Sequence, residues 1–172
     1  APSYDHVKTA VRSVGCPVLL NGNVTSVKSA NKLRELTGSH GVMIGRSAIR
    51  NPWIFRQIRE SQDGEEVFCP TLSDVYEYVV DLYDSIEKPE IEERKNVGRM
   101  KKFLNFVGLS VDAEGQFLHL MRRTQSKKDL FEVCAHYLLS EGREGQFYNL
   151  EPFDGLVARP SSESSYSTCQ LG

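Results

Sequence analysis

The apolar positions of residues 1–60 predict an alternation of helices and short strands. Residues 4–13 carry valine and alanine at helical spacing, which predicts a helix. Residues 17–21 and 41–44 are short apolar runs bounded by turn residues, a pattern typical of parallel strands buried on both faces. Between them a helix capped by a serine or threonine and ended by Gly38 is expected, so the segment predicts a βαβ unit.

Beyond residue 46 the pattern predicts helices and no further strand. A short helical piece is expected first, and a second helix from Pro52, because proline favours the first position of a helix. The polar residues 61–71 indicate a linker. Amphipathic segments then predict helices over residues 72–86, 90–107, 113–123 and 126–139. A Gly-, Pro- and Ser-rich end predicts an irregular tail over 141–172, on the surface or disordered.

The start of the chain indicates a fragment of a longer polypeptide. There is no initiating methionine, and a helix opens the chain where an α/β unit should begin with a strand. Two parallel strands alone leave open edges. We therefore expect the isolated chain to fold poorly.

Composition and charge narrow the class of protein. The chain has 172 residues, of which 40% are hydrophobic and 26% charged, as expected for one domain or two small ones. A net charge of −2 gives no overall attraction to nucleic acid, so any RNA surface must be a local patch. No apolar run approaches the roughly 20 residues of a membrane span. The four cysteines have no metal-binding spacing, which predicts reduced cytoplasmic thiols and no metal.

Each of the two expected strands ends in a glycine turn. Asn21, Gly22 and Asn23 follow the first strand, and Gly45 and Arg46 follow the second. Ligands of parallel sheets bind at the carboxyl ends of the strands, where glycine lets the backbone approach an anion and an arginine fork binds phosphate oxygens. The pattern predicts a phosphate site. The alternative is that the glycines only form tight turns.

The same residues resemble two sequence elements of the tRNA-dihydrouridine synthases. Residues 17–23 read PVLLNGN, similar to the family's PVIxNGD, and residues 41–55 read GVMIGRSAIRNPWIF, similar to GVMIGRGALGNPWxF. The spacing between the elements also matches. Asn23 stands where the family usually has aspartate, and Arg50 where it usually has glycine. The resemblance is strong over residues 1–60 and general in character from there to about residue 140.

The resemblance implies the fold class, an α/β TIM barrel of (β/α)8 type followed by an all-α helical domain. Residues 1–60 would be the last part of the FMN-binding barrel, and residues 72–140 the helical tRNA-binding domain. A whole barrel needs about 250 residues. The family's catalytic cysteine lies earlier in the barrel, so no catalytic residue is expected in this chain, and the chain alone should be inactive.

The resemblance also implies the reaction and the partners. Uridine in tRNA would be reduced to 5,6-dihydrouridine by FMN, with NADPH as the reductant, in a monomer that needs no metal and no membrane. By position, the cofactor-binding residues would hold the FMN phosphate: Asn21, Gly22, Asn23, Gly45 and Arg46.

A basic stripe on the expected helix 90–107 is a candidate RNA surface. Apolar residues at helical spacing form the face assigned to the core, and the basic residues share the opposite face with Phe106. A second basic cluster near residue 122 could extend the stripe. The RNA-binding candidates are Lys95, Arg99, Lys101, Lys102, Phe106, Arg122 and Arg123. The alternatives are a solvated face paired with the preceding glutamates, and a core position for Phe106 if another helix covers it.

Two rival functions remain open at this point. Another FMN-dependent barrel oxidoreductase acting on a small molecule would share the phosphate turns but would not need the basic stripe. A non-catalytic RNA-binding module would use the helical part alone and would bind no flavin. His119 and His136 have no recognisable partner in the sequence and are not expected to be catalytic.

Overall fold

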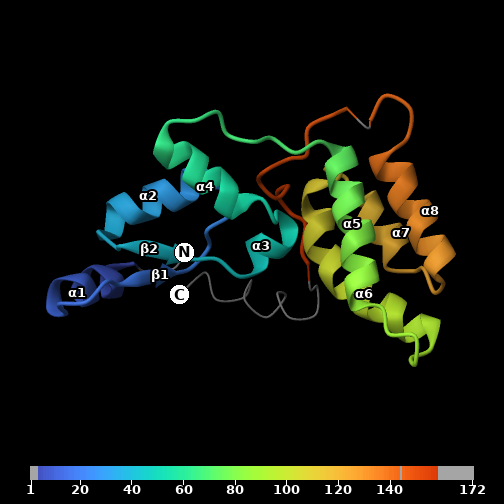
Figure 1. Cartoon of the computed structure of the whole chain (residues 1–172), viewed down its shortest axis with the longest axis horizontal. Helices are drawn as coiled ribbons and strands as arrows, with labels where there is room; N and C mark the ends of the chain where they lie inside the picture. The colour runs from blue at the N-terminus through green and yellow to red at the C-terminus, as the bar shows by residue number, and fades with distance from the viewer. Residues whose placement is uncertain (1–3, 144, 159–172) are drawn as a thin grey trace, which may run out of the picture. The chain divides into compact units, whose positions relative to one another are not determined.

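The computed structural model describes residues 4–143 and 145–158. The chain divides into two compact units at the junction between Phe68 and Cys69 (Figure 1), within the segment expected to be a linker. The first unit is mixed α/β and the second is helical. Among the residues that the structure describes, no helix has the length and the apolar character that crossing a bilayer requires.

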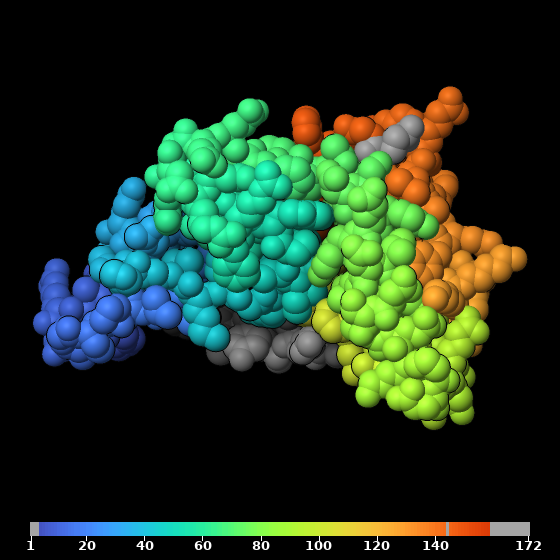
Figure 2. Space-filling view, in the orientation of Figure 1, coloured from blue at the N-terminus to red at the C-terminus, as the bar shows by residue number. Residues whose placement is uncertain are grey.

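The first unit is built on a strand–helix–strand core, as the sequence predicts. The strands β1 (Leu19–Asn21) and β2 (Gly41–Met43) pair in parallel, with Leu20 opposite Val42. The helices are α1 (Asp5–Ser13), α2 (Val27–Thr37), α3 (Arg46–Arg50) and α4 (Ile54–Asp63). Helix α1 lies at the rim of this unit (dark blue in Figures 1 and 2), and none of its residues is buried.

The sheet is buried on one face, which corrects the expectation that both faces are covered. Leu20 is fully buried and packs with Val42 and residues of α2 and α4. The side chains of Leu19 and Met43 are 63% and 59% exposed. Side chains alternate along a strand, so these two share the opposite face, which is largely exposed at both positions.

Local chemistry sets where the helices of the first unit begin and end. Ser26 caps α2 through a capping box with Ser29, and Gly38 ends it in the left-handed conformation with a φ of 70°. Helix α4 starts at Ile54 rather than at the predicted Pro52, which lies in the preceding turn. The helix also runs on to Asp63, so residues 61–63 are helical rather than linker.

The second unit contains the four predicted helices, three of them with ends that differ from the prediction, and one short helix that was not predicted. Its elements are α5 (Leu72–Ile86), α6 (Glu93–Val107), the short 3-10 helix η1 (Gly108–Ser110), α7 (Gln116–Met121) and α8 (Lys127–Leu138). Helix α7 is shorter than the expected 113–123. The carboxylate of Asp112 accepts hydrogen bonds from the backbone N–H groups of Gln116 and Phe117, at 2.8 and 2.9 Å, and so fixes its start.

The described part of the tail, residues 145–158, is irregular but packed against the helices. Tyr148 is 2% exposed, and its hydroxyl donates a hydrogen bond to the carbonyl of Val107 at 2.7 Å. Phe147 forms an isolated bridge with Thr71. Only Tyr148 and Ala158 are buried in this part, and most of its other residues are exposed, so it lies along the surface, one of the two alternatives expected for it. Residues 144 and 159–172 lie outside the described residues.

Candidate functional site

The parallel pairing brings the two predicted glycine turns to one edge of the sheet. Asn21 lies opposite Met43, so both strands end at the same level. The turn of Gly22 and Asn23 follows β1, and the turn of Gly45 and Arg46 follows β2. All five predicted phosphate-binding positions therefore lie at the carboxyl edge of the strands, where parallel sheets bind ligands.

The first turn has a backbone that glycine allows. Gly22 has a φ of 157° and Asn23 a φ of 32°, the only non-glycine residue with a positive φ among those described. Asparagine tolerates this left-handed region better than most residues. A Cβ on Gly22 would lie 3.5 Å from the ring of Tyr4. The turn is thus shaped by both its own backbone and the aromatic ring beside it.

The second turn leads directly into a helix. Gly45 is the N-cap residue of α3, and Arg46 is the first residue of that helix; both are exposed. A Cβ on Gly45 would meet no protein atom within 4 Å. The space beside this glycine can therefore accept a ligand, and the arginine provides a charged donor next to it.

A buried arginine connects the two turns. The guanidinium of Arg50, the last residue of α3, donates a hydrogen bond to the carbonyl of Thr25 at 2.6 Å. The N–H of Thr25 donates to the hydroxyl of Ser29 at 2.8 Å. Comparison with the family element singles out Arg50 but not this contact, because the contact joins residues that are 25 positions apart.

The edge of the sheet has the chemistry of an anion site. Helix α2 starts just after the first turn, and a helix N-terminus carries a partial positive charge. Arg46 adds a full charge at the second turn. A phosphate monoester such as that of FMN fits this donor set, because it is small, anionic and able to approach glycine backbone closely.

In the helical unit the predicted RNA-binding residues separate into exposed and anchored groups. Lys95, Lys102 and Arg123 are exposed. Lys95 lies 3.4 Å from Glu92, but both side chains are largely in solvent, where such a pair contributes little. Arg99 is half-buried, and its buried Nη1 has no hydrogen-bond partner among the described residues.

Lys101 and Arg122 form hydrogen bonds that join separate segments of the helical unit. The Nζ of Lys101 donates to the carbonyl of Thr124 at 2.5 Å, and burial lowers the pKa of this amine, with Arg94 adding to the shift. Arg122 donates at 2.7 Å to the side-chain oxygen of Asn105 and at 2.7 Å to the carbonyl of Val157. Burial lowers the pKa of Arg122 as well. These contacts give both residues a structural role.

Phe106 does not extend the exposed basic stripe as expected. Its side chain is only 6% exposed, and it lies in the core with Leu104 and Val107. The buried arc of α6 is wider than the single apolar face that the sequence suggested, because η1, α7 and α8 also pack against this helix. The alternative of a core position for Phe106 is therefore correct.

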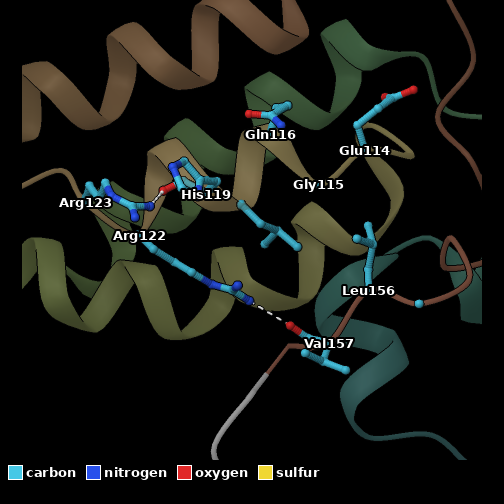
Figure 3. Close-up of a pocket in the computed structure, with 10 residues that line it drawn as sticks. Glu114, Gly115, Gln116, His119, Arg122, Arg123, Leu156 and Val157 are labelled. Atoms are coloured by element: carbon cyan, nitrogen blue, oxygen red, sulfur yellow. Dashed lines mark hydrogen bonds between the residues drawn. The ribbon is translucent and has the colours of Figure 1, made fainter.

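A pocket of about 350 Å³ lies beside the two neighbouring arginines (Figure 3). Arg122 reaches across it to Val157, and Arg123 donates from Nη1 to the carbonyl of His119 at 2.9 Å. Leu156 of the tail lines the same pocket. The tail thus forms part of its wall. Arg123 and His119 are exposed at this pocket, and the carboxylate-bearing Glu114 also lines it.

A polar network that the sequence did not reveal holds the end of the first unit on α4. The side chain of Gln57 is 1% exposed and donates to the carbonyl of Phe68 at 2.8 Å. The carboxylate of Glu60 accepts the N–H of Phe68 at 2.7 Å, and the guanidinium of Arg56 lies 4.3 Å from the centre of the Phe68 ring. Phe68 is therefore fixed by its backbone and its side chain.

The cysteines and histidines of the described ranges belong to no metal-binding cluster. Cys16 and Cys69 are exposed, and Cys134 is buried, with its pKa raised to about 12 by burial. Cys169 lies outside the described residues. His119 is exposed, and His136 packs on the ring of Tyr137. Residues 4–143 and 145–158 contain no cluster of His, Cys, Asp and Glu that could hold a metal ion.

Comparison with known proteins identifies the family of the chain. The family model for dihydrouridine synthase (Dus) matches residues 2–140. The tRNA-dihydrouridine synthase B of Pseudomonas putida is 40% identical over 73 residues, which cover 42% of this chain and 22% of that protein. The corresponding enzyme of Proteus vulgaris is 37% identical over 67 residues, covering 39% of this chain and 21% of that protein.

A third relative extends the match. A probable tRNA-dihydrouridine synthase of Rickettsia conorii is 31% identical over 84 residues, covering 48% of this chain and 25% of that protein. The matched regions therefore span about a fifth to a quarter of the length of these relatives. Since the family model covers most of the chain, across both units, the chain belongs to the dihydrouridine synthase family.

Proposed function

We propose that this chain supplies the phosphate end of the FMN site and the RNA-binding helical domain of a tRNA-dihydrouridine synthase. The observation that carries the proposal is the pairing of two glycine turns at one edge of a parallel sheet, in a chain of this family. The first unit would be the last part of a (β/α)8 barrel. The exposed face of Leu19 and Met43 would then face the interior of that barrel.

The residues at the sheet edge would bind and orient the cofactor. Gly22, Asn23 and Gly45 would offer backbone to the phosphate, and Arg46 would balance its charge. When bound, FMN supplies the hydride that reduces the C5–C6 bond of uridine, after NADPH has reduced the flavin. No cysteine of this chain serves as the proton donor in the proposal, so that residue belongs to another part of the protein.

The exposed cations of the second unit would hold the tRNA backbone. Lys95 and Lys102 lie on α6, and Arg123 follows α7 beside the pocket. Positive side chains in solvent bind phosphates by releasing counterions, without reading a sequence. The net charge of the chain is −2, so the chain as a whole does not attract RNA. The attraction would come from these exposed cations alone.

The cofactor role is tested by FMN binding to the full-length polypeptide that contains this chain. Arg46→Met should weaken FMN binding by roughly tenfold, since a charge-assisted contact to phosphate is lost. Arg12→Met removes an exposed arginine from α1 and serves as the matched control. A protein that takes up no FMN would support the non-catalytic rival and overturn the proposal.

The substrate that reacts with the flavin distinguishes the proposed function from its remaining rival, an FMN-dependent barrel oxidoreductase acting on a small molecule. Single-turnover reduction of uridine in unmodified tRNA should oxidise the flavin, whereas a barrel oxidoreductase for small molecules would leave tRNA unchanged. Reduction of the flavin by dihydroorotate-type substrates, with no reaction on tRNA, would favour that rival.

A further inference from the structure

The arginine at position 50 occupies an unusual place for a charged side chain. It is 3% exposed and ends the short helix α3, which starts at the second glycine turn. Burying a guanidinium is costly unless its donors are satisfied. Arg50 also stands where the family element has glycine, which has no side chain to make any such contact. The burial therefore calls for a specific role.

The contact of Arg50 reaches the exit of the first turn. Its Nη2 donates to the carbonyl of Thr25 at 2.6 Å, a short hydrogen bond from a charged donor. The other backbone group of Thr25, its N–H, donates to the hydroxyl of Ser29 at 2.8 Å, inside the capping box of α2. Both polar groups of the Thr25 backbone are thus held, from two different helices.

The two attachments fix the first turn relative to the second. Asn23 has a φ of 32°, a conformation that costs a non-glycine residue free energy and persists where the surrounding structure holds it. Arg50 is joined to Gly45 and Arg46 by a single short helix, so its position follows that of the second turn. The hydrogen bond to Thr25 therefore transmits the position of one turn to the other.

We infer that Arg50 is a positioning residue that sets the spacing of the two turns for the phosphate of FMN. The inference rests on the proposed function. Arg50 acts through the Thr25 carbonyl and not by touching the cofactor. We call the hydrogen bond from Arg50 to the Thr25 carbonyl the brace. Because the brace concerns only the phosphate end of the site, its loss should weaken the binding of ligands that carry the phosphate. It should leave the contacts to the isoalloxazine and ribityl groups unchanged. A general loss of folding would affect both.

The test compares FMN with riboflavin on the full-length polypeptide. Arg50→Met keeps much of the length of the side chain but removes the donor. We expect its Kd for FMN to rise about tenfold or more, as for a misplaced binding group, with the Kd for riboflavin within about twofold of the wild type. Arg50→Lys keeps a charge and a donor group at the end of a shorter side chain, and should give an intermediate Kd for FMN. Arg12→Met is the matched control for charge and should change neither.

Each outcome decides the inference. Equal losses for FMN and riboflavin, or an unchanged Kd for FMN in Arg50→Met, overturn it. Should Arg50→Met not accumulate as a folded protein, Arg50→Lys decides alone: a weakened FMN Kd with unchanged riboflavin binding supports the brace, and wild-type FMN binding or an equal loss of both ligands overturns it. A wild-type protein that prefers FMN to riboflavin keeps the proposed function standing even when the brace fails. A wild type that binds neither ligand overturns the proposed function itself.

Discussion

The glycines of the two turns differ in what a methyl group would meet. Gly22 has a positive φ, so a side chain there is strained even though its Cβ would have room beside Tyr4. Gly45 has a φ of −105° and open space around the position of a Cβ. The first glycine serves the conformation of the backbone, and the second leaves space for a ligand.

The same substitution at these two glycines should therefore have different effects. Gly22→Ala is expected to destabilise the protein by about 1–3 kcal/mol through backbone strain. Gly45→Ala should lower stability by less than about 1 kcal/mol, the usual range for an N-cap change, while weakening FMN binding. Urea unfolding and flavin titration of the full-length polypeptide separate the two effects. Equal stability losses at both positions would contradict this difference.

The contact between Glu60 and Phe68 makes the stability of the first unit depend on pH. The hydrogen bond from the N–H of Phe68 is the main cause that lowers the pKa of this carboxyl below its usual 4.5, and burial acts in the opposite direction. Because the pKa is lowered in the folded state, the stabilisation is complete above the unfolded value. It is lost as the pH falls through the lowered folded value.

Replacing Glu60 by glutamine should flatten this part of the pH profile. Urea unfolding of the wild type should weaken with acid between about pH 5 and 3, and the Glu60→Gln variant should weaken less over the same range. Glu35→Gln, an exposed carboxyl on α2, provides the control and should follow the wild type. A Glu60→Gln variant whose unfolding free energy depends on pH as the wild type's does would show that the contact to Phe68 does not contribute to this pH dependence.

Helix α6 has a buried arc that packs in the core and a separate exposed part that carries two lysines. Its buried arc includes Val97, Met100 and Phe106, and part-buried Lys101 binds the carbonyl of Thr124. Lys95 and Lys102 point their charges to solvent. Under the proposed function, RNA binding and folding would therefore depend on different lysines of one helix.

Charge reversal of the two exposed lysines should weaken tRNA binding without unfolding the protein. The double variant Lys95→Glu with Lys102→Glu should lower affinity and reduce the salt dependence by roughly one unit of slope per lysine. Lys32→Glu on α2 is the exposed control. Filter binding over a range of salt concentrations measures both quantities, and an unchanged slope would remove α6 from the RNA surface.

The tail stabilises the helical unit through one buried hydroxyl. Tyr148→Phe leaves the carbonyl of Val107 without the hydrogen bond from this residue and should cost about 1–2 kcal/mol in unfolding free energy. Tyr76→Phe keeps a ring that packs on Phe131 and is the matched control. Thermal melts of both variants test the difference, and equal Tm values for the two would argue against a packed tail.

At the scale of the whole molecule, patterns of neighbouring residues predicted the helices, strands and turns, but they did not predict the contacts between distant elements. The strand–helix–strand unit and the glycine turns follow from apolar runs and turn residues that lie next to each other in the chain. The bond from Arg50 to Thr25 and the position of Phe106 depend on which distant elements pack together. Periodicity within one helix cannot show this, since it describes one face and not the neighbours that widen it.

The anchoring of Phe68 and Pro70 determines how closely the two units are tethered. Phe68 is fixed to the first unit by Gln57 and Glu60, and the carbonyl of Pro70 accepts the N–H of Tyr148 in the second. Only Cys69 lies between these anchors, so the tether spans at most about 7 Å instead of the length of an eleven-residue linker. In polymer terms, so short a tether gives each unit a high effective concentration at the other. Under the proposed function, this short covalent link would join the flavin-binding part of the chain to its RNA-binding part.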